Sequence, residues 1–373
     1  MGLNKHKIGS LIKIIDERNI YGIRSFFGIN INKEFMPTVA NIEGLDENNY
    51  KVVRKNRFVF SGMQTGRDEC IRISMYLNDA PIIVSPAYTT FEIEATSVVL
   101  PTYFFMIFLS KERDRLGWFY SDGSIRSNLD WDRFCDIELE LPDIPTQQKY
   151  VDIYKAMVAN QQSYKCGLEN LKLVCDGYFD GAKKGKTMPL GNLIESVDLR
   201  NNNYLYSEKD VKGITNNKEF SETKADIEST DLTKFKIVQP GEFAYNSRTD
   251  GRDMLVLALN REKHPIIVTF NYNVFKIREE MENVIIAEYL YAFFKRSEFD
   301  RKVRFASWGS SQELLSWDNL CGIETPVPDI QEQQCIAEIM HTYIHRKKIE
   351  EQLKAQIKDA CPILIRGSLE EGK

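Results

Sequence analysis

Two stretches of the chain carry residues whose types and spacing are typical of catalytic chemistry. Gly181 to Thr187 is similar to a phosphate-binding loop, but three residues separate its glycines where four are needed. His341 and His345 lie four apart, as in a zinc-protease helix, but Thr342 stands where that chemistry requires glutamate. We interpret the first stretch as a linker and the second as a helix face. We therefore expect no catalytic residue, no bound cofactor and no metal site in this chain.

A second set of residues has the chemistry that reads nucleic acid. Arg, Asn, Gln, Ser and Thr side chains hydrogen-bond to base edges and phosphates, and here they cluster beside glycine turns. The candidates in the first half of the chain are Gln64, Thr65, Arg67, Ser124 and Arg126. Those in the second half are Asn246, Ser247, Arg248, Thr249, Arg252, Ser310, Ser311 and Gln312. The alternative is that Gly-Arg-Asp simply closes a turn, with the arginine paired to a nearby carboxylate.

Composition and net charge limit which functions these candidate residues can serve. The chain has 373 residues and a net charge of -5, so any nucleic-acid binding must use local basic patches or a basic partner. Its seven scattered cysteines form no C-x-x-C pair, which indicates a reducing, cytoplasmic environment and no disulfide framework. The longest apolar run, Tyr103 to Leu109, is too short to span a membrane. Cys135 and Cys321 follow tryptophans at equivalent places, and we interpret both as core residues.

The chain repeats itself with an offset of about 182 to 186 residues. Among the repeated signals are Gly66-Arg67-Asp68 with Gly251-Arg252-Asp253, and Asp114-Arg115 with Asp300-Arg301. The phrase at Pro142 to Gln148 returns at Pro328 to Gln334, each time before a helical pattern. The order of these signals is kept along a whole domain, so we predict an internal duplication.

Each copy has the pattern of a mixed α+β globule. Short β-branched and aromatic runs predict strands at 58–60, 81–84, 265–268 and 274–277, and apolar runs predict helices at 98–109 and 284–294. The predicted domains are residues 1–142, a central helix over 143–180, a linker over 181–186, a second domain over 187–328, and a C-terminal helix and tail over 329–373.

The two long helices each carry an apolar stripe that must be covered. Asp143 and Asp329 are placed to cap their first turns, and Pro362 is expected to end the second helix. The simplest way to bury both stripes is for the helices to pack against each other as an antiparallel coiled coil.

These residues resemble the specificity (S) subunits of Type I restriction–modification systems over the full length of the chain. The resemblance is carried by two diverged recognition copies, each followed by a helix that a proline-led phrase ending in Gln-Gln introduces. The first phrase has Thr146 where the second has Glu332. The resemblance implies an α+β fold with two target-recognition domains in a pseudo-two-fold arrangement, separated by two long antiparallel helices.

The resemblance also implies a function. It indicates a non-catalytic protein that binds double-stranded DNA and reads a bipartite target, one half per domain. The expected partners are two DNA methyltransferase subunits, which would carry S-adenosylmethionine, and a restriction or motor subunit. No membrane partner is expected.

Two other functions remain open from the residues alone. The chain could be a nuclease-like enzyme with a cryptic site among Asp250, Asp253 and Glu262, although the usual motifs are missing. It could also be an adaptor whose globules no longer bind DNA, which the negative net charge allows.

Overall fold

The computed structural model describes residues 3–38, 44–182, 186–223, 227, 230–249, 254–307 and 313–373. The chain divides into two compact units. Unit 1 comprises Met1–Tyr164 and Ile349–Lys373, and unit 2 comprises Lys165–Lys348. Each unit therefore contains one copy of the repeat together with part of each long helix, and the predicted two-domain α+β organisation is confirmed.

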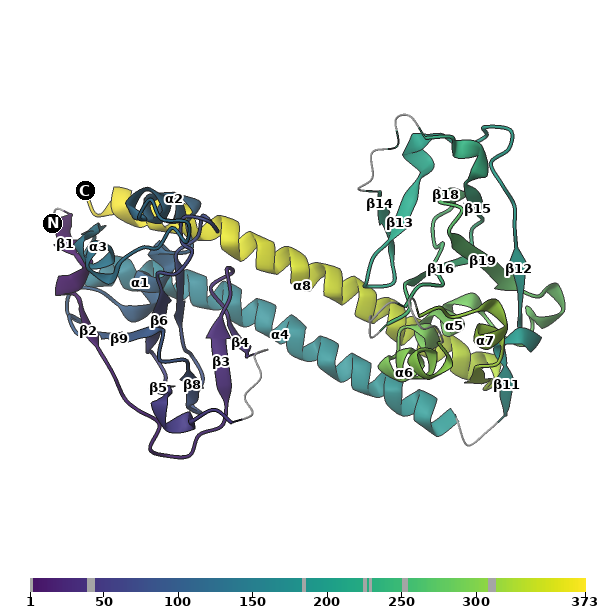
Figure 1. Ribbon diagram of the computed structural model, residues 1–373, viewed down its shortest axis with the longest axis horizontal. Helices are drawn as coiled ribbons and strands as arrows, with labels where there is room; N and C mark the ends of the chain where they lie inside the picture. The colour runs from purple at the N-terminus through teal and green to yellow at the C-terminus, as the bar shows by residue number, and fades with distance from the viewer. Residues whose placement is uncertain are drawn as a thin grey trace. The chain divides into compact units, whose positions relative to one another are not determined.

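Unit 1 is built on two four-stranded sheets (Figure 1). The first contains, in spatial order, β2 (Ile12–Ile14), β9 (Thr89–Ile93), β6 (Phe58–Ser61) and β7 (Arg72–Met75). The second contains β4 (Phe35–Pro37), β3 (Phe26–Ile29), β8 (Ile82–Val84) and β5 (Lys51–Val53). An antiparallel pair joins β1 (Asn4–Lys7) to β10 (Glu138–Leu141). The helices are α1 (Pro101–Ile107), α2 (Lys111–Tyr120) and α3 (Trp131–Asp136).

Unit 2 repeats this plan, but the four strands that correspond to the second sheet of unit 1 form two separate pairs. Its main sheet contains β12 (Ile194–Val197), β19 (Tyr272–Ile277), β16 (Phe243–Asn246) and β17 (Leu257–Leu259). Three antiparallel pairs join β13 (Lys212–Ile214) to β14 (Phe220–Glu222), β15 (Lys236–Val238) to β18 (Ile266–Val268), and β11 (Thr187–Pro189) to β20 (Glu324–Pro326). The helices are α5 (Ala287–Phe294), α6 (Ser297–Ala306) and α7 (Trp317–Cys321). Each predicted strand and helix overlaps an observed element of the same type: 58–60 with β6, 81–84 with β8, 265–268 with β18, 274–277 with β19, 98–109 with α1 and 284–294 with α5.

The same aromatic cluster fills the core under both main sheets. In unit 1, Phe58 stacks on Phe91 with ring centroids 5.0 Å apart, and Phe104 of α1 meets Phe58 edge-on. In unit 2, Phe243 stacks on Phe275 at 4.9 Å, and Phe294 meets Phe243 edge-on. Buried aromatic pairs in such geometries stabilise a core beyond the area they bury. The predicted duplication therefore extends to the packing.

Two long helices follow the globules, α4 (Ile144–Ala182) and α8 (Ile330–Glu371). The Asp143 carboxylate accepts the Thr146 backbone N–H at 3.0 Å, and Asp329 accepts the Glu332 N–H at 2.9 Å. Both capping predictions are confirmed, because a carboxylate that takes a free N–H of the first turn stabilises the helix start.

Within unit 1 the two helices pack antiparallel. Lys149, early in α4, pairs with Glu371, late in α8, at 2.8 Å. Gln161, further along α4, hydrogen-bonds to Glu350, which lies earlier in α8. The partners therefore run in opposite directions, as the apolar stripes predict.

The expectation that Pro362 ends the second helix is wrong, since α8 continues to Glu371. A proline inside a helix removes one backbone hydrogen bond and costs roughly 3 kcal/mol. Tertiary packing offsets that cost here, because Leu364 and Ile365 pack on the core of unit 1. The buried hydroxyl of Ser368 also lies 2.7 Å from that of Tyr103. The tendency of Pro362 to end a helix is therefore outweighed by the burial of residues in the last turns of α8.

Candidate nucleic-acid interface

In unit 1 the structure brings the two predicted loops together. The loop after β6 lies beside the loop that joins α2 to α3. The Leu129 N–H donates to the Gly62 carbonyl at 2.8 Å, and the Gly66 N–H donates to the Ser127 carbonyl at 2.9 Å. The side chain of Asn128 accepts the Gln64 N–H at 3.1 Å. We call this pair, residues 61–70 with 121–129, the paired loops of unit 1.

Two glycines allow this close approach. A Cβ on Gly62 would lie 1.9 Å from the Leu129 carbonyl oxygen, and one on Gly66 would lie 1.9 Å from the Ser127 hydroxyl. Real Cβ atoms do not come that close to another heavy atom, so a side chain at either position would push the loops apart. Both glycines are needed because only a residue without a side chain lets the two loops pack this closely. The glycine of the Gly-Arg-Asp motif therefore serves loop packing as well as the turn.

The second of the paired loops is organised by one carboxylate. Asp122 accepts from the Ser124 N–H at 3.1 Å, the Ser124 hydroxyl at 2.6 Å and the Asn128 N–H at 3.0 Å. These hydrogen bonds hold the pKa of Asp122 below its ordinary value. The loop tip that they fix leaves Ile125 and Arg126 exposed.

The predicted side chains of unit 1 divide into two groups. Thr65 is buried and its hydroxyl donates to the Gly62 carbonyl at 3.0 Å, so it holds the loop from inside. Gln64 is half-buried and lies 3.4 Å from the guanidinium of Arg72. Ser124 is exposed, with its hydroxyl engaged by the loop itself. Arg67 and Arg126 are the exposed cations of the paired loops, although Arg67 also contacts its neighbour Asp68 at 3.3 Å.

Unit 2 pairs its loops in the same way. The Leu315 N–H donates to the Ser247 carbonyl at 2.8 Å, and the Thr249 N–H donates to the Glu313 carbonyl at 2.9 Å. Arg248 faces Leu314 across an isolated antiparallel bridge. We call residues 246–249 with 313–315 the paired loops of unit 2.

Arg248 is the exposed cation of this second pair. The half-buried side chain of Asn246 accepts the Arg248 N–H at 3.0 Å, whereas Thr249 is buried and is held against the Glu313 carbonyl. Ser247 is half-buried. Four predicted contacts, Arg252, Ser310, Ser311 and Gln312, lie outside the described residues.

Sequence reasoning missed an aromatic feature next to both sets of paired loops. Phe119, near the end of α2, is 79% exposed, and Phe305, near the end of α6, is 88% exposed. Phe119 lies two residues before Ser121, where the second of the paired loops of unit 1 begins, and Phe305 lies two residues before Ser307, the first residue after α6. The offset of 186 residues between the two phenylalanines is the repeat itself, so an alignment of the copies would have found them.

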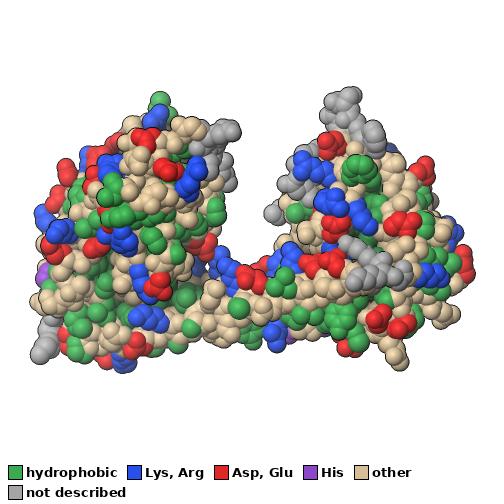
Figure 2. Space-filling view, turned by 90° about the horizontal axis from the view of Figure 1, so that it is seen from below, with side chains coloured by type: hydrophobic (Ala, Val, Ile, Leu, Met, Phe, Trp, Pro, Cys, Tyr) green, Lys and Arg blue, Asp and Glu red, His purple; other side chains and the backbone are tan. Residues whose placement is uncertain are grey.

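Charge on the surface is mixed. Figure 2 shows Lys and Arg interspersed with Asp and Glu on the face in view of each unit, as the net charge of -5 leads one to expect. The described residues include no group of three or more His, Cys, Asp or Glu side chains that could hold a metal ion. Asp250 and Asp253 of the nuclease alternative lie outside those residues, and Glu262 is exposed.

The described helices include no segment long and apolar enough to cross a bilayer. His341 and His345 both lie on the exposed side of α8, as the helix-face interpretation predicts. Residues 183–185 of the predicted linker lie outside the described part of the chain.

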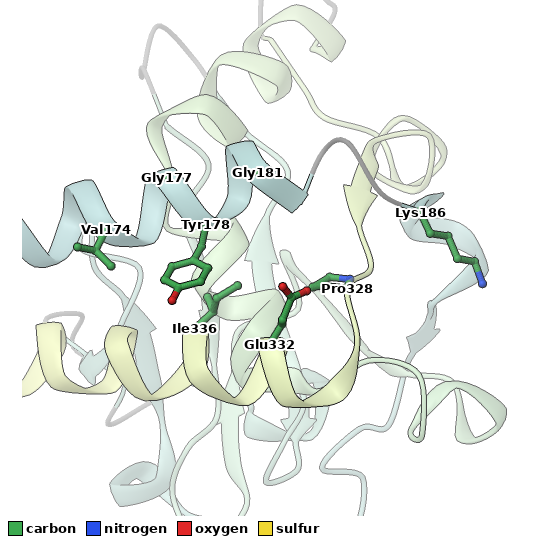
Figure 3. Close-up of a pocket in the computed structure, with 8 residues that line it drawn as sticks. All are labelled: Val174, Gly177, Tyr178, Gly181, Lys186, Pro328, Glu332 and Ile336. Atoms are coloured by element: carbon green, nitrogen blue, oxygen red, sulfur yellow. The ribbon is translucent and has the colours of Figure 1, made fainter.

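In unit 2, a groove of about 510 Å³ runs between the end of α4 and the start of α8. Gly177 and Gly181 form part of its wall, and a Cβ at either would meet no atom within 4 Å. Tyr178 and Ile336 point toward one another across the groove, whereas Lys186 points away from it (Figure 3). Tyr178 and Val174 are both 46% exposed, so an apolar strip of α4 faces solvent.

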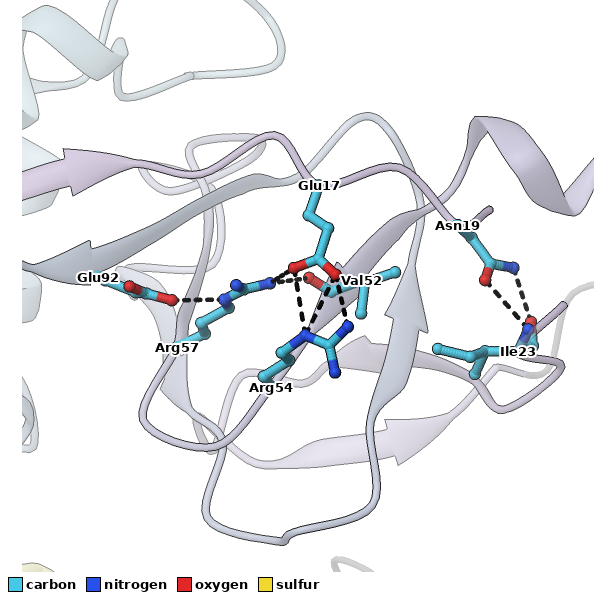
Figure 4. Close-up of polar contacts among 7 residues, drawn as sticks. All are labelled: Glu17, Asn19, Ile23, Val52, Arg54, Arg57 and Glu92. Atoms are coloured by element: carbon cyan, nitrogen blue, oxygen red, sulfur yellow. Dashed lines mark hydrogen bonds and ion pairs between the residues drawn. The ribbon is translucent and has the colours of Figure 1, made fainter. Parts of the chain in front are cut away.

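A carboxylate network holds one edge of unit 1 (Figure 4). Glu17 pairs with Arg54 at 2.7 Å and with Arg57, and Arg57 also reaches Glu92 at 2.6 Å. The hydrogen bond from Arg54 is the largest cause that lowers the pKa of Glu17 from 4.5 to about 2. The aligned residue of unit 2 is Leu199, so this network is specific to unit 1.

This network predicts acid sensitivity of unit 1. Because the pKa of Glu17 is lower in the folded state, its contribution is complete above about pH 4.5 and is lost as pH falls toward 2. Glu17→Gln should remove at most about 3 kcal/mol at pH 7 and flatten the loss of stability below pH 4.5. Thermal unfolding against pH measures this, with Glu94→Gln, an exposed pair with Lys13 at 3.8 Å, as the control. A pH profile unchanged by Glu17→Gln would contradict it.

Residues 186–359, which hold the second copy of the repeat, match the family model of the Type I restriction modification DNA specificity domain. The resemblance that the sequence indicates is therefore confirmed.

The fold is also similar to a solved structure along the whole chain, and two further structures match with lower scores. The crystal structure of a Type-I restriction-modification system S subunit from M. genitalium matches with a TM-score of 0.54 at 12% identity, covering 100% of this chain and 96% of that one. A structure of a type I R-M system, described for its complex assembly and conformational transition, matches with a TM-score of 0.46 at 11% identity over 99% and 97% of the chains. The HsdS subunit from Thermoanaerobacter tengcongensis matches with a TM-score of 0.36 at 13% identity over 99% and 96%. A search of curated proteins found no match.

Proposed function

We propose that the chain is the sequence-specific DNA-binding subunit of a Type I restriction–modification complex, and that each unit reads one half of a bipartite target. The observation that carries this proposal is the pairing of polar loops on one backbone frame in both units. Leu129 bonds to Gly62 in unit 1 as Leu315 bonds to Ser247 in unit 2.

The two frames carry different side chains, which is what reading two different half-sites requires. Position 62 is glycine in unit 1, and its counterpart in unit 2 is Ser247. The exposed cations are Arg67 and Arg126 in the first pair and Arg248 in the second. Bidentate arginine contacts to guanine are the commonest specific base contact, and one is worth about 1–3 kcal/mol of discrimination.

Because the surface charge is mixed, we propose that partner subunits supply part of the DNA affinity. DNA affinity comes largely from neutralised phosphates, and a chain of net charge -5 offers few basic patches for that. We assign the missing phosphate contacts and the chemistry to two methyltransferase subunits that carry S-adenosylmethionine, with a restriction or motor subunit joining them. The open apolar strip at Val174 and Tyr178 is a surface on which such a subunit could pack. The chain itself acts as a non-catalytic reader.

Footprinting on DNA tests this function. The chain with its methyltransferase should protect two short sequences with an unread spacer, and binding should weaken steeply as salt rises. A single contiguous protected site would contradict bipartite reading. Metal-dependent cleavage by the purified chain alone would favour the nuclease alternative.

Arg248→Ala should relax recognition of one half-site and leave the other unchanged. Loss of one bidentate contact predicts about a tenfold loss of discrimination at that position. A binding selection on randomised half-sites measures it, with Arg126→Ala as the matched variant that should affect only the opposite half-site. Equal loss at both half-sites from either variant would show that these arginines bind phosphate or stabilise the chain instead.

A further inference from the structure

A four-residue sequence occurs once in each copy of the repeat and is not used by the proposed contacts. Asn-Lys-Glu-Phe stands at 32–35 and again at 217–220. It forms the turn between β3 and β4 in unit 1 and between β13 and β14 in unit 2. Its lysine has a positive φ in both places, 63° at Lys33 and 60° at Lys218. Few lysines adopt that backbone conformation, so the turn is held by something beyond its own preference.

The lysine side chain makes the same two contacts in both units. Lys33 Nζ lies 2.6 Å from an Asp114 carboxylate oxygen and 2.6 Å from the Phe108 carbonyl after α1. Lys218 Nζ lies 2.6 Å from Asp300 and 2.5 Å from the Phe294 carbonyl at the end of α5. The ammonium group thus joins the hairpin to the negative end of one helix and to the first turns of the next.

The aspartate connects this lysine to the paired loops. The same oxygen of Asp114 accepts the Ile71 N–H at 3.0 Å, directly after the loop of residues 61–70. In unit 2, the same oxygen of Asp300 accepts the Leu255 N–H at 3.0 Å. Lysine, aspartate and loop exit therefore form one chain of hydrogen bonds in each unit.

Burial makes this arrangement costly. The lysine side chains are 5% exposed, and Asp114 and Asp300 are 19% and 13% exposed. In unit 2, burial lowers the pKa of Lys218 and raises that of Asp300, so the environment disfavours both charges. A buried ion pair of this kind is often no more stabilising than apolar residues of similar volume. Its occurrence in both diverged copies therefore calls for a role other than stability.

We propose that the Lys33–Asp114 pair and its counterpart Lys218–Asp300 are positioning residues for DNA reading, each fixing the exit of the loop that follows β6 or β16. The proposal rests on the proposed function. A loop already held in its binding geometry does not lose conformational freedom when DNA binds, so the pair improves affinity without touching DNA.

The test removes the pair without leaving a buried charge. Lys33→Met/Asp114→Leu deletes both charges and the acceptor for the Ile71 N–H. It should lower affinity for the first half-site about tenfold or more while the second half-site is read as before. Lys218→Met/Asp300→Leu should give the mirror result. Each variant thus carries its own internal control in the other unit.

A conservative variant separates positioning from general stability. Lys33→Met/Asp114→Asn also removes both charges, but its amide oxygen can still accept the Ile71 N–H. It should regain most of the first half-site binding that the leucine variant loses. Equal binding by the two variants, or wild-type binding by the leucine variant, would overturn the proposal.

Hydrogen exchange supplies a readout that does not need DNA. Amides of residues 62–71 should exchange faster in the leucine variant than in the asparagine variant, with unit 2 unchanged. Should unit 1 of the leucine variant fail to fold, the asparagine variant is compared with wild type. If the Ile71 amide in the asparagine variant loses its protection from exchange as completely as the Lys33 amide does, the proposal is overturned. A wild-type chain that binds no split target refutes the proposed function instead, and the exchange result still decides the role of the pair.

Discussion

Gly62→Ala is expected to abolish reading of the first half-site. The added Cβ would lie 1.9 Å from the Leu129 carbonyl oxygen, and that oxygen belongs to the backbone of the opposite loop. The clash cannot be relieved by a side-chain rotation, so the loops must separate and the 2.8 Å bond from Leu129 N–H to Gly62 is lost. Forcing extra volume into a packed site costs about 1–3 kcal/mol of stability, and here that cost destabilises the contact between the paired loops. Half-site binding selections and hydrogen exchange at residues 62–70 measure the effect.

A neighbouring glycine offers a rescue that distinguishes a clash from a change in chain flexibility. At Gly66 the added Cβ would meet the side chain of Ser127 at 1.9 Å. Gly66→Ala should therefore fail alone and recover when combined with Ser127→Gly, since Ser127 has a φ of 49° that glycine adopts readily. Gly62→Ala should not recover with any side-chain change, because its obstacle is a carbonyl.

Gly123→Ala is the matched control. Gly123 lies in the second of the paired loops, and a Cβ there would meet nothing within 4 Å. It should bind both half-sites as the wild type does. First half-site binding that survives Gly62→Ala, or is lost equally in Gly123→Ala, would show that close approach of the loops is unimportant for reading.

The fold was predictable where one residue pattern dominates a segment. Strand runs such as Phe58 to Phe60 and the capping aspartates Asp143 and Asp329 depend on neighbours within a few residues, and the structure has them as predicted. Pro362 was misjudged because its outcome depends on Ser368 and Ile365 meeting a core formed more than two hundred residues earlier. Local preference is readable from sequence, whereas the free energy of a distant contact is not.

The candidate site was predictable as a pair of loops but not as a set of side chains. Repetition of Gly-Arg-Asp and Gly-Ser located both segments, and backbone hydrogen bonds bring the described parts of each pair together. Thr65 and Thr249 looked like base readers by residue type, yet both are buried and hold carbonyl groups of the loops. The lysine–aspartate pairs went unseen, because their partners are about eighty residues apart and only the shared Asn-Lys-Glu-Phe sequence marks them.

The Gln-Gln phrase that introduces each long helix predicts the other large effect, on stability. Gln147 is fully buried, and its amide accepts the Leu100 N–H at 3.0 Å and donates to the Val98 and Pro142 carbonyls at 2.8 and 2.9 Å. Gln333 repeats this pattern in unit 2, with Ile286, Val284 and Pro328 as partners. The first residue of each Gln-Gln pair therefore joins the start of a long helix to the segment before α1 or α5.

Gln147→Leu should destabilise unit 1 by about 3–5 kcal/mol, because it leaves three buried backbone groups without a partner and each costs about 1–3 kcal/mol. Gln333→Leu should do the same to unit 2, and urea unfolding followed by hydrogen exchange assigns each loss to its unit. Gln148→Leu is the matched control, since Gln148 is exposed and bonds only to Asp152 on its own helix at 2.6 Å. Its expected change is below about 0.5 kcal/mol. Equal effects of Gln147→Leu and Gln148→Leu would mean that the phrase acts through helix propensity, and the buried amide would then have no part in joining helix to domain.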